Sequence, residues 1–456
     1  MCNGVRWLSS LALVAALGVL SLATPLQAGS TERITKDTRW QGEVVLSGPV
    51  QVDTGARLTI APGSVVRAKL PGSKLLVLGT LMVEGSATAP VRFVSVKGWE
   101  GIEFIEAAKG SVIRHAEFDG AQHAVSMIAT SPQIIGSLFR NCKIALRLLR
   151  EAAPLVEGNR FEANQIGVDN EMRSAPTVRG NHFSDHTTSA IVASNNARGL
   201  IEDNRFENNK QGVGIVQPYP DPLRGNRFVG NETALFCSQT KNTPLIEKNL
   251  FEKNGKGVVN YSFAYPAVER NRFIDNDEAI RNDQFGSARI SHNLIRGSKT
   301  ALYLNRKSNP VIEYNLITDN RLAMFVDYSS YPRVTNNHFL ANDMAVKLGI
   351  YQSADWEKRS GSKRLVQKEA TARRSKNPLL AQAPESFNDY VDVSGNWWGE
   401  ANRLLKRAGG DANLEIFHDR RDQPRVTYPG FGEGSYALDV IRYAPWLTKP
   451  VAEVGP

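Results

Sequence analysis

The feature that most constrains the fold is a unit of 22 or 23 residues that repeats along most of the chain. Its clearest copy, PLVEGNRFEAN, runs from Pro154 to Asn164, and the same frame returns near the end of the array as PRVTNNHFLAN from Pro332. The central Asn recurs at Asn159, Asn181, Asn204, Asn226, Asn249, Asn271, Asn293, Asn315 and Asn337. So regular a period predicts a solenoid, in which each turn packs only on its neighbours.

The apolar positions within each unit alternate with other positions, as they do in strands. Two apolar residues separated by one other residue therefore lie on the same face of the strand. One column, two residues after the central Asn, reads Phe139, Phe161, Phe183, Phe206, Phe228, Phe251, Phe273, Ile295, Ile317 and Phe339. A coil of three short strands cannot bury its apolar face alone, so the coils must stack, and parallel strands so joined wind right-handed. The predicted fold is therefore all-β: a right-handed parallel β-helix with ~22-residue coils and N- and C-terminal caps.

Two recurring positions of the unit are interpreted as structural: the central Asn at a bend, and the outward-facing position two residues before it. We expect the central Asn to occupy a bend between strands, because Asn tolerates left-handed backbone, and to hydrogen-bond to its copies above and below. Two residues before it, Glu157, Arg179 and Glu202 alternate in charge. Such alternation is typical of an exposed charge ladder between coils.

Composition shifts divide the chain into five parts. Residues 1–28 have a positive start, an apolar stretch of about 15 residues and a final Ala28, as in a secretory signal peptide, and that stretch is short of the ~20 residues needed to span a membrane. We expect an N-terminal cap and first coils over 29–110 and regular coils over 111–349. A basic insertion or loop at 350–390 precedes the last coil and C-terminal cap at 391–456.

The chain resembles right-handed parallel β-helix proteins of the pectate-lyase-like group, of the secreted bacterial type. The resemblance rests on the repeat, on GARLTIAPGSVVRA at 55–68, and on GNWWG at 395–399 followed by YAPWL at 443–447. It implies the fold rather than an activity, because this fold hosts lyases, hydrolases, epimerases, adhesins and accessory proteins.

The copies differ most in the turn before each Pro, where aromatic and charged side chains gather across several coils. Rings stack on sugar faces and charges hold hydroxyls or carboxylates, so we predict a ligand-binding face there. Its candidate residues are Tyr219, Tyr261, Tyr265, Arg281, Asp283, Phe285, Asp327, Tyr328, Tyr331 and Lys347. Asp283 and Asp327 lie two coils apart, roughly 9–10 Å, which is at or past the upper end for an inverting carboxylate pair, so no catalytic residue is assigned.

The sequence predicts no metal and no cofactor. His182, Asp185 and His186 lie close together, but three ligands from one coil make a weak site. Cys142 and Cys237 lie four repeats apart, ~19 Å at the spacing of stacked strands, so we expect free thiols rather than a disulfide. The β-helix accessory protein for copper-site assembly in nitrous oxide reductase has the same broad fold, yet copper handling would call for more Met, His or Cys.

The function that we predict from the sequence is an exported, non-catalytic β-helix binding or scaffold protein, periplasmic or extracellular. We expect it to recognise polysaccharide, or another cell-envelope component, through the aromatic turn face. We expect no nucleic-acid partner and no transmembrane segment after the signal is removed. Two alternatives stay open: a polysaccharide-active lyase, hydrolase or epimerase, and a periplasmic accessory protein for metalloenzyme assembly.

Overall fold

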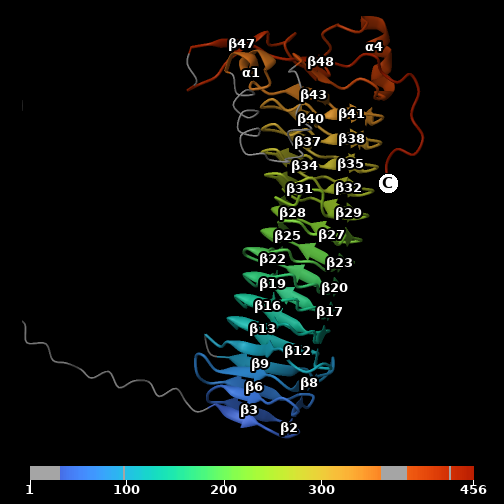
Figure 1. Ribbon diagram of the computed structural model, residues 1–456. Coiled ribbons are helices and arrows are strands. Elements are labelled where there is room, and N and C mark those ends of the chain that lie inside the picture. Colours follow the sequence, from blue (N-terminus) through green and yellow to red (C-terminus); the bar gives the residue numbers. More distant parts are fainter. Residues whose placement is uncertain (1–30, 96–97, 361–387, 431–432) are drawn as a thin grey trace, which may run out of the picture.

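The computed structural model of the protein describes residues 31–95, 98–360, 388–430 and 433–456. It forms one tall column of stacked coils (Figure 1). The predicted signal peptide and most of the predicted basic insertion lie outside the described residues. No helix within the described ranges is long and apolar enough to span a membrane.

Three parallel sheets run along the column and account for the three strands of each coil. Sheet A, of 16 strands, contains β1 (Glu32–Ile34), β4 (Val50–Val52), β7 (Lys74–Val77), β10 (Gly101–Ile105), β13 (His123–Ile128), β16 (Ile144–Leu149), β19 (Ile166–Asn170), β22 (Ser189–Ala193), β25 (Gln211–Val216), β28 (Thr233–Ser238), β31 (Lys256–Tyr261), β34 (Glu278–Asp283), β37 (Thr300–Leu304), β40 (Leu322–Val326), β43 (Met344–Leu348) and β45 (Phe417–His418).

Sheets B and C have 14 strands each, which corresponds to 14 turns of the solenoid. Sheet B contains β2 (Thr38–Trp40), β5 (Arg57–Ile60), β8 (Thr80–Glu84), β11 (Val112–Arg114), β14 (Gln133–Ile135), β17 (Leu155–Glu157), β20 (Thr177–Arg179), β23 (Leu200–Glu202), β26 (Leu223–Arg224), β29 (Leu245–Glu247), β32 (Ala267–Glu269), β35 (Arg289–Ser291), β38 (Val311–Glu313) and β41 (Arg333–Thr335). Sheet C contains β3 (Glu43–Leu46), β6 (Val65–Ala68), β9 (Val91–Ser95), β12 (Ala116–Asp119), β15 (Leu138–Arg140), β18 (Arg160–Glu162), β21 (His182–Ser184), β24 (Arg205–Glu207), β27 (Arg227–Val229), β30 (Leu250–Glu252), β33 (Arg272–Ile274), β36 (Leu294–Arg296), β39 (Leu316–Thr318) and β42 (His338–Leu340). The predicted parallel β-solenoid is confirmed.

The core is built from columns of identical positions, because the coils stack in register. The predicted Phe column is a continuous stack: Phe139 and Phe161 lie with ring centroids 5.0 Å apart, and Phe161 and Phe183 lie 4.6 Å apart. The column begins earlier than predicted, at Phe93 and Phe118. All of these rings are buried.

The central Asn column forms a buried hydrogen-bonded ladder, as predicted. Asn249 is typical: its Nδ2 donates to the carbonyls of Leu223 and Glu247 and to Asn271 Oδ1, each at 3.0 Å. Its Oδ1 accepts from the backbone N–H of Asn226 at 2.9 Å. Each Asn thereby satisfies backbone groups that the bend leaves without a sheet partner.

The bend itself differs from the prediction in one respect. The left-handed residue is the one before the Asn, for example Gly158 (φ 65°) or Asp203 (φ 54°). The Asn points its side chain inward instead, because its amide is needed for the ladder. The sequence analysis also missed a second, parallel ladder five residues further on, whose members are Asn164, His186, Asn209, Asn231, Asn254, Asn276, Asn320 and Asn342.

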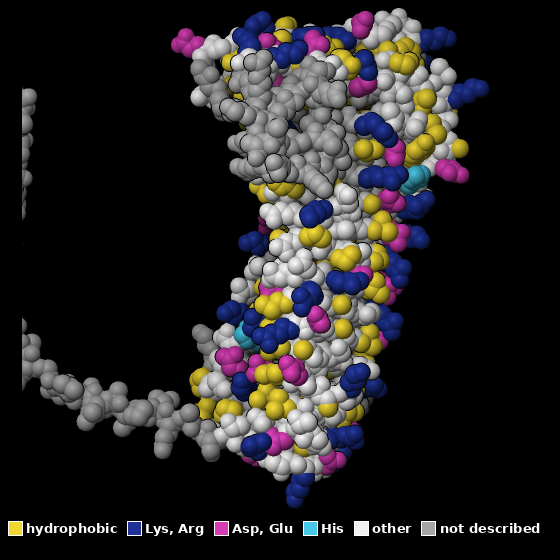
Figure 2. Space-filling model, viewed as in Figure 1, with side chains coloured by type: hydrophobic (Ala, Val, Ile, Leu, Met, Phe, Trp, Pro, Cys, Tyr) yellow, Lys and Arg dark blue, Asp and Glu magenta, His cyan; other side chains and the backbone are white. Residues whose placement is uncertain are grey.

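The outer face of sheet B carries the predicted charge ladder. Arg179 Nε lies 2.9 Å from Glu157, and Arg224 lies 2.9 Å from Glu202. Figure 2 shows Lys and Arg side chains interleaved with acidic ones along the edge over these strands. These pairs are largely exposed, so each contributes little to stability.

The C-terminal end of the column is closed by short elements. The helix α1 (Ala354–Ser360) docks on the turns of sheet A through the buried Glu357, which accepts from Ser329 Oγ at 2.6 Å and pairs with Lys307 at 3.3 Å. The remaining elements are η1 (Gly399–Ala401), α4 (Asn402–Ala408), the parallel pair β44 (Tyr390–Asp392) and β48 (Val440–Arg442), and the antiparallel pair β46 (Arg425–Thr427) and β47 (Ser435–Ala437).

Candidate functional site

The outer face of sheet A holds a row of half-buried aromatic side chains. In β28, β37 and β40 the residue between the two inward positions is aromatic: Phe236, Tyr303 and Phe325. Register pairing aligns Arg281 of β34 with Tyr303, and Tyr303 with Phe325. The pleat therefore points all four side chains outward in one line along the column axis.

Direct contacts join the side chains on this face into two groups, with Val259 between Phe236 and Arg281 in the row. The Tyr303 and Phe325 rings stack with centroids 5.0 Å apart, and the Arg281 guanidinium lies 4.1 Å from the Tyr303 ring centroid. At the other end Phe236 and Tyr261 are tilted with centroids 6.1 Å apart. We name these five residues, Phe236, Tyr261, Arg281, Tyr303 and Phe325, the sheet A strip.

Asp283 anchors the charged part of the strip. Its side chain is 2 % exposed and is held by Arg281 at 2.8 Å and by Arg306 of the next turn at 2.6 Å. Burial alone would raise the pKa of Asp283, but the hydrogen bonds from both guanidiniums outweigh it and hold this pKa below its ordinary value. Arg281 is also held by Glu278 at 3.1 Å, so its position is fixed before any ligand arrives.

Asp327 occupies the matching position two coils further on but has a different environment. No cation pairs with it among the described residues; its Oδ1 accepts from the backbone N–H groups of Tyr328 at 2.9 Å and Tyr351 at 2.8 Å. Burial raises the pKa of Asp327 to about 6, because these two bonds only partly offset the loss of water. The pKa values of the two carboxyls are thus shifted in opposite directions, downward for Asp283 and upward for Asp327.

Two predicted ligand-binding residues use their hydroxyls for internal hydrogen bonds; the Tyr219 ring is buried and the Tyr331 ring is half-buried. Tyr219 is 1 % exposed, and its hydroxyl donates to the carbonyl of Gly199 at 2.6 Å. The hydroxyl of Tyr331 donates to Asp439 at 2.9 Å and ties the turn to the C-terminal cap. Tyr265 is half-buried, and its hydroxyl has no hydrogen-bond partner in the described part of the chain. The aromatic turns are therefore partly internal packing, because a ring fills the space under a turn well.

Of the remaining predicted residues, Phe285 and Tyr328 lie in turns outside the strip. Phe285 stacks on Phe263 at 5.4 Å, and Tyr328 stacks on Tyr351 at 4.1 Å. Lys347 continues the outward row beyond Phe325 and is exposed. Of the predicted set, the structure brings together Tyr261, Arg281 and Asp283.

Sequence reasoning missed Phe236, Tyr303, Phe325 and Arg306. The first three stand ten residues after a central Asn, between the two inward positions. Strand alternation could have placed them outward, as it did Arg281 and Lys347. Arg306 lies in a turn, where the repeat gives no such signal.

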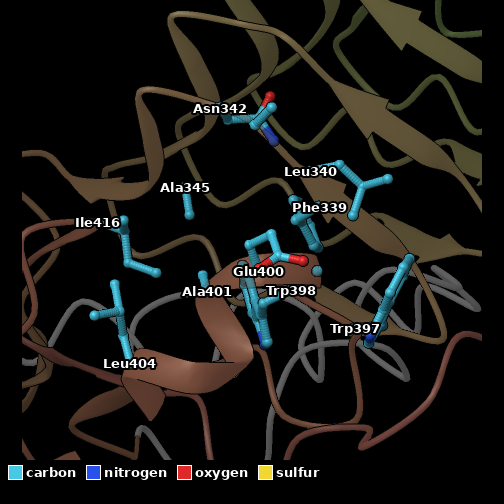
Figure 3. Close-up of a pocket in the computed structure, with 12 residues that line it drawn as sticks. Phe339, Leu340, Asn342, Ala345, Trp397, Trp398, Glu400, Ala401, Leu404 and Ile416 are labelled. Carbon is cyan, nitrogen blue, oxygen red and sulfur yellow. The ribbon is translucent and has the colours of Figure 1, made fainter.

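Apart from the strip, a cavity lies at the C-terminal end of the column. This apolar cavity of about 500 Å³ is lined by Phe339, Leu340, Trp397, Trp398, Leu404 and Ile416, among others. Figure 3 shows both Trp side chains and Leu404 around it. It holds few polar groups, so it offers little to orient a ligand.

The fold defines the class: a right-handed parallel β-helix protein. Residues 81–218 match the family model "Right handed beta helix region". Residues 221–371 match the family model "Periplasmic copper-binding protein (NosD)". Of the functions considered from the sequence, this second match favours the accessory protein over the polysaccharide-binding protein.

Solved structures with similar coils include a double mutant of the periplasmic alginate epimerase AlgG and the Dettilon tailspike protein. The epimerase is 13 % identical, with 69 % of this chain and 78 % of that chain covered and a TM-score of 0.35. The tailspike is 15 % identical, with 72 % and 63 % covered and a TM-score of 0.21. No curated protein matches the chain significantly.

The described residues do not fit a copper site. They contain no group of three His, Cys, Asp or Glu side chains placed to hold a metal ion. Cys142 and Cys237 are buried free thiols, as predicted, and burial raises the pKa of Cys142 to about 12. His186 sits in the second Asn ladder, where burial lowers its pKa to about 4, while His182 turns outward to Glu207 at 2.8 Å. The two His side chains therefore serve different neighbours.

Proposed function

We propose that this protein is a periplasmic accessory protein that binds a partner protein through the sheet A strip, without holding copper in its own β-helix. The proposal rests on where the strip lies in the sequence. The strip, from Phe236 to Phe325, lies wholly inside residues 221–371, the segment that matches the periplasmic copper-binding family. The described residues of that segment, 221–360, contain no group of three metal-ligating side chains. The strip is the feature of these residues that supports a binding role.

The physical character of the strip supports a binding role. Its rings are half-buried on a stiff sheet, so little side-chain freedom is lost when a partner covers them. Aromatic residues and Arg are also the residue types that carry most of the binding energy at protein interfaces. Arg281 is held by Glu278 and Asp283, so its guanidinium is already oriented.

The test is co-purification from a periplasmic extract with the mature chain as bait. Replacing Tyr303→Ala and Phe325→Ala together removes the stacked pair at the centre of the strip. Tyr314→Ala is the matched control, because Tyr314 stacks on His292 at 5.3 Å in a turn away from sheet A. We expect the double variant to lose a partner that both the native chain and the control retain. Equal recovery by all three proteins contradicts the proposal.

A second candidate is polysaccharide binding through the same strip. Rings in adjacent coils, as in Tyr303 and Phe325, repeat at roughly the ~4.8 Å spacing of parallel strands, and flat rings suit sugar faces. A glycan array with the same variants separates the two candidates. Retention of a glycan that the double variant loses favours polysaccharide, whereas no glycan retained together with a strip-dependent protein partner favours the accessory role.

A further inference from the structure

A charged cavity lies on the outer face of sheet A, far below the strip. Its volume is about 280 Å³, and β7, β10, β13 and β16 supply most of its wall. The polar side chains of the lining are Lys74, Glu100, Glu103, His123, Ser126 and Arg147. Figure 2 shows charged side chains of both signs over these lower coils. The cavity lies outside residues 221–371 and is independent of the function proposed above.

Most charges in this cavity already have a partner. Lys74 Nζ lies 2.8 Å from Glu103, and the exposed fractions of their side chains are 37 % and 26 %. His123 Nδ1 lies 3.6 Å from Glu100. The Lys74–Glu103 pair is balanced, whereas His123 offsets the charge of Glu100 only when His123 is protonated. One cationic residue of the lining has no ion-pair partner among the described residues.

That residue is Arg147. It is half-buried, forms no ion pair among the described residues, and its Nε is buried without a hydrogen-bond partner. Register pairing places it between Ser126 of the coil below and Asp169 of the coil above. Arg147 as a whole is only half-buried and lines the cavity, so a carboxylate there could supply an acceptor that its guanidinium lacks among the described residues.

We propose that this cavity binds a small organic monocarboxylate, with the carboxylate on the Arg147 guanidinium and the body of the ligand against Ile128 and Leu149. A planar guanidinium matches a carboxylate with two parallel hydrogen bonds. Ile128 and Leu149 supply an apolar wall in the same lining. Glu100 and Glu103 disfavour a doubly charged anion such as phosphate, because like charges repel across a half-buried cavity.

The surrounding titratable groups give the binding a pH dependence. Burial, helped by the neighbouring Glu171 and opposed by Arg147, raises the pKa of Asp169 to about 6. Burial, followed by the charge of Arg147, lowers the pKa of His123, with Glu100 opposing and Lys143 adding to the effect. As the pH falls towards 6, the carboxylate of Asp169 becomes partly protonated and loses part of its negative charge. Carboxylate affinity is therefore expected to increase as the pH falls from about 8 to about 6.

The experiment is calorimetric or NMR titration of the mature protein with glucuronate as the probe, and with glucose and inorganic phosphate as controls. We expect glucuronate to bind and both controls to bind much more weakly. Arg147→Gln should weaken binding about tenfold or more, because a charge-assisted pair is lost. Arg114→Gln is the matched control: Arg114 is exposed on sheet B with no ion pair among the described residues, and its loss should leave the affinity unchanged.

Asp169→Asn provides a test in the opposite direction, since removing the competing carboxylate should tighten glucuronate binding at neutral pH and flatten its pH dependence.

If Arg147→Gln does not fold, as judged by its thermal transition, Arg147→Lys keeps the charge and should weaken binding, because Lys lacks the paired N–H donors of the guanidinium. A hyaluronan tetrasaccharide carries the same group within a glycan; tighter binding than free glucuronate assigns the ligand to a glycan, and weaker binding assigns it to a free acid. Absence of binding by both acids, or equal binding by the Gln and native proteins, overturns the proposal.

Discussion

Asp283 and Asp327 occupy equivalent positions two coils apart, yet their substitution by Asn should change stability in opposite directions. Asp283 lies between two guanidiniums at 2.8 and 2.6 Å, whereas Asp327 accepts only backbone N–H groups. Asn matches Asp in shape, so the comparison isolates the charge.

For Asp327 the folded-state pKa is raised from 3.8 to about 6. A raised pKa means that the folded state favours the protonated form. The contribution of Asp327 to stability is thus fully present below the unfolded-state pKa and is lost as the pH rises through about 6. Two pKa units correspond to about 3 kcal/mol, so above pH 7 the charged form disfavours folding by that order. Asp327→Asn keeps the Oδ1 acceptor and should stabilise the protein at pH 7.5 by up to about 2–3 kcal/mol.

For Asp283 the sign is reversed, because its folded-state pKa is lowered. Its contribution is present above the unfolded-state pKa of ~3.9 and is lost as the pH falls through the lower folded value. Removing one partner of a buried pair typically destabilises by 3–5 kcal/mol. Arg281 keeps Glu278 and Arg306 is 47 % exposed, so Asp283→Asn should destabilise by about 2–3 kcal/mol at pH 7.5, somewhat below this range.

The assay is thermal unfolding of the mature protein and both variants, followed by circular dichroism between about pH 5 and pH 8. A solenoid can unfold in segments, so hydrogen exchange in peptides containing Tyr328 and Tyr351 provides a local measurement beside the global one. The native protein should gain stability relative to Asp327→Asn as the pH falls from 8 to 5. Destabilisation by both substitutions at pH 7.5, with no pH-dependent difference between them, would refute the electrostatic reasoning.

Two further predictions concern the interior of the column. Asn249→Ala should destabilise the protein by about 3–5 kcal/mol, since several buried groups, each worth about 1–3 kcal/mol, lose their partners; the exposed Asn242→Ala should have no measurable effect in the same denaturant titration. Cys142 and Cys237 should resist alkylation at pH 8 in the native protein and react fully in guanidinium, as read by mass spectrometry of their peptides. Rapid native labelling of either thiol would show that its coil opens.

The fold could be predicted from the sequence because the same pattern of apolar and Asn positions recurs in successive coils. A Phe two residues after each central Asn places one ring in each coil, and the period requires these rings to stack. The Asn ladder followed from the same argument. The second ladder was missed because its column is broken by Cys142, His186 and Ser298, so the Asn signal is weaker there.

The candidate site was harder to predict, because the repeat fixes what points inward but not what meets on the outside. Tyr219 and Tyr331 are of a residue type common at binding surfaces, but here they pack beneath turns. The sequence period does not distinguish a Tyr that packs beneath a turn from one that binds a ligand. The pairing of Arg306 with Asp283 joins a turn to a strand of the preceding coil, which only the stacked structure reveals.

The sequence by itself determined that the chain coils, where the coil bends, and which side chains form the core. It did so because those features repeat every 22 or 23 residues and depend on local alternation. The tertiary structure alone decided which outward residues come together, since that depends on the stacking of coils and on excursions that interrupt the period. Asn396 illustrates this, because it continues the ladder directly after Asn337 although 59 residues separate the two in the chain.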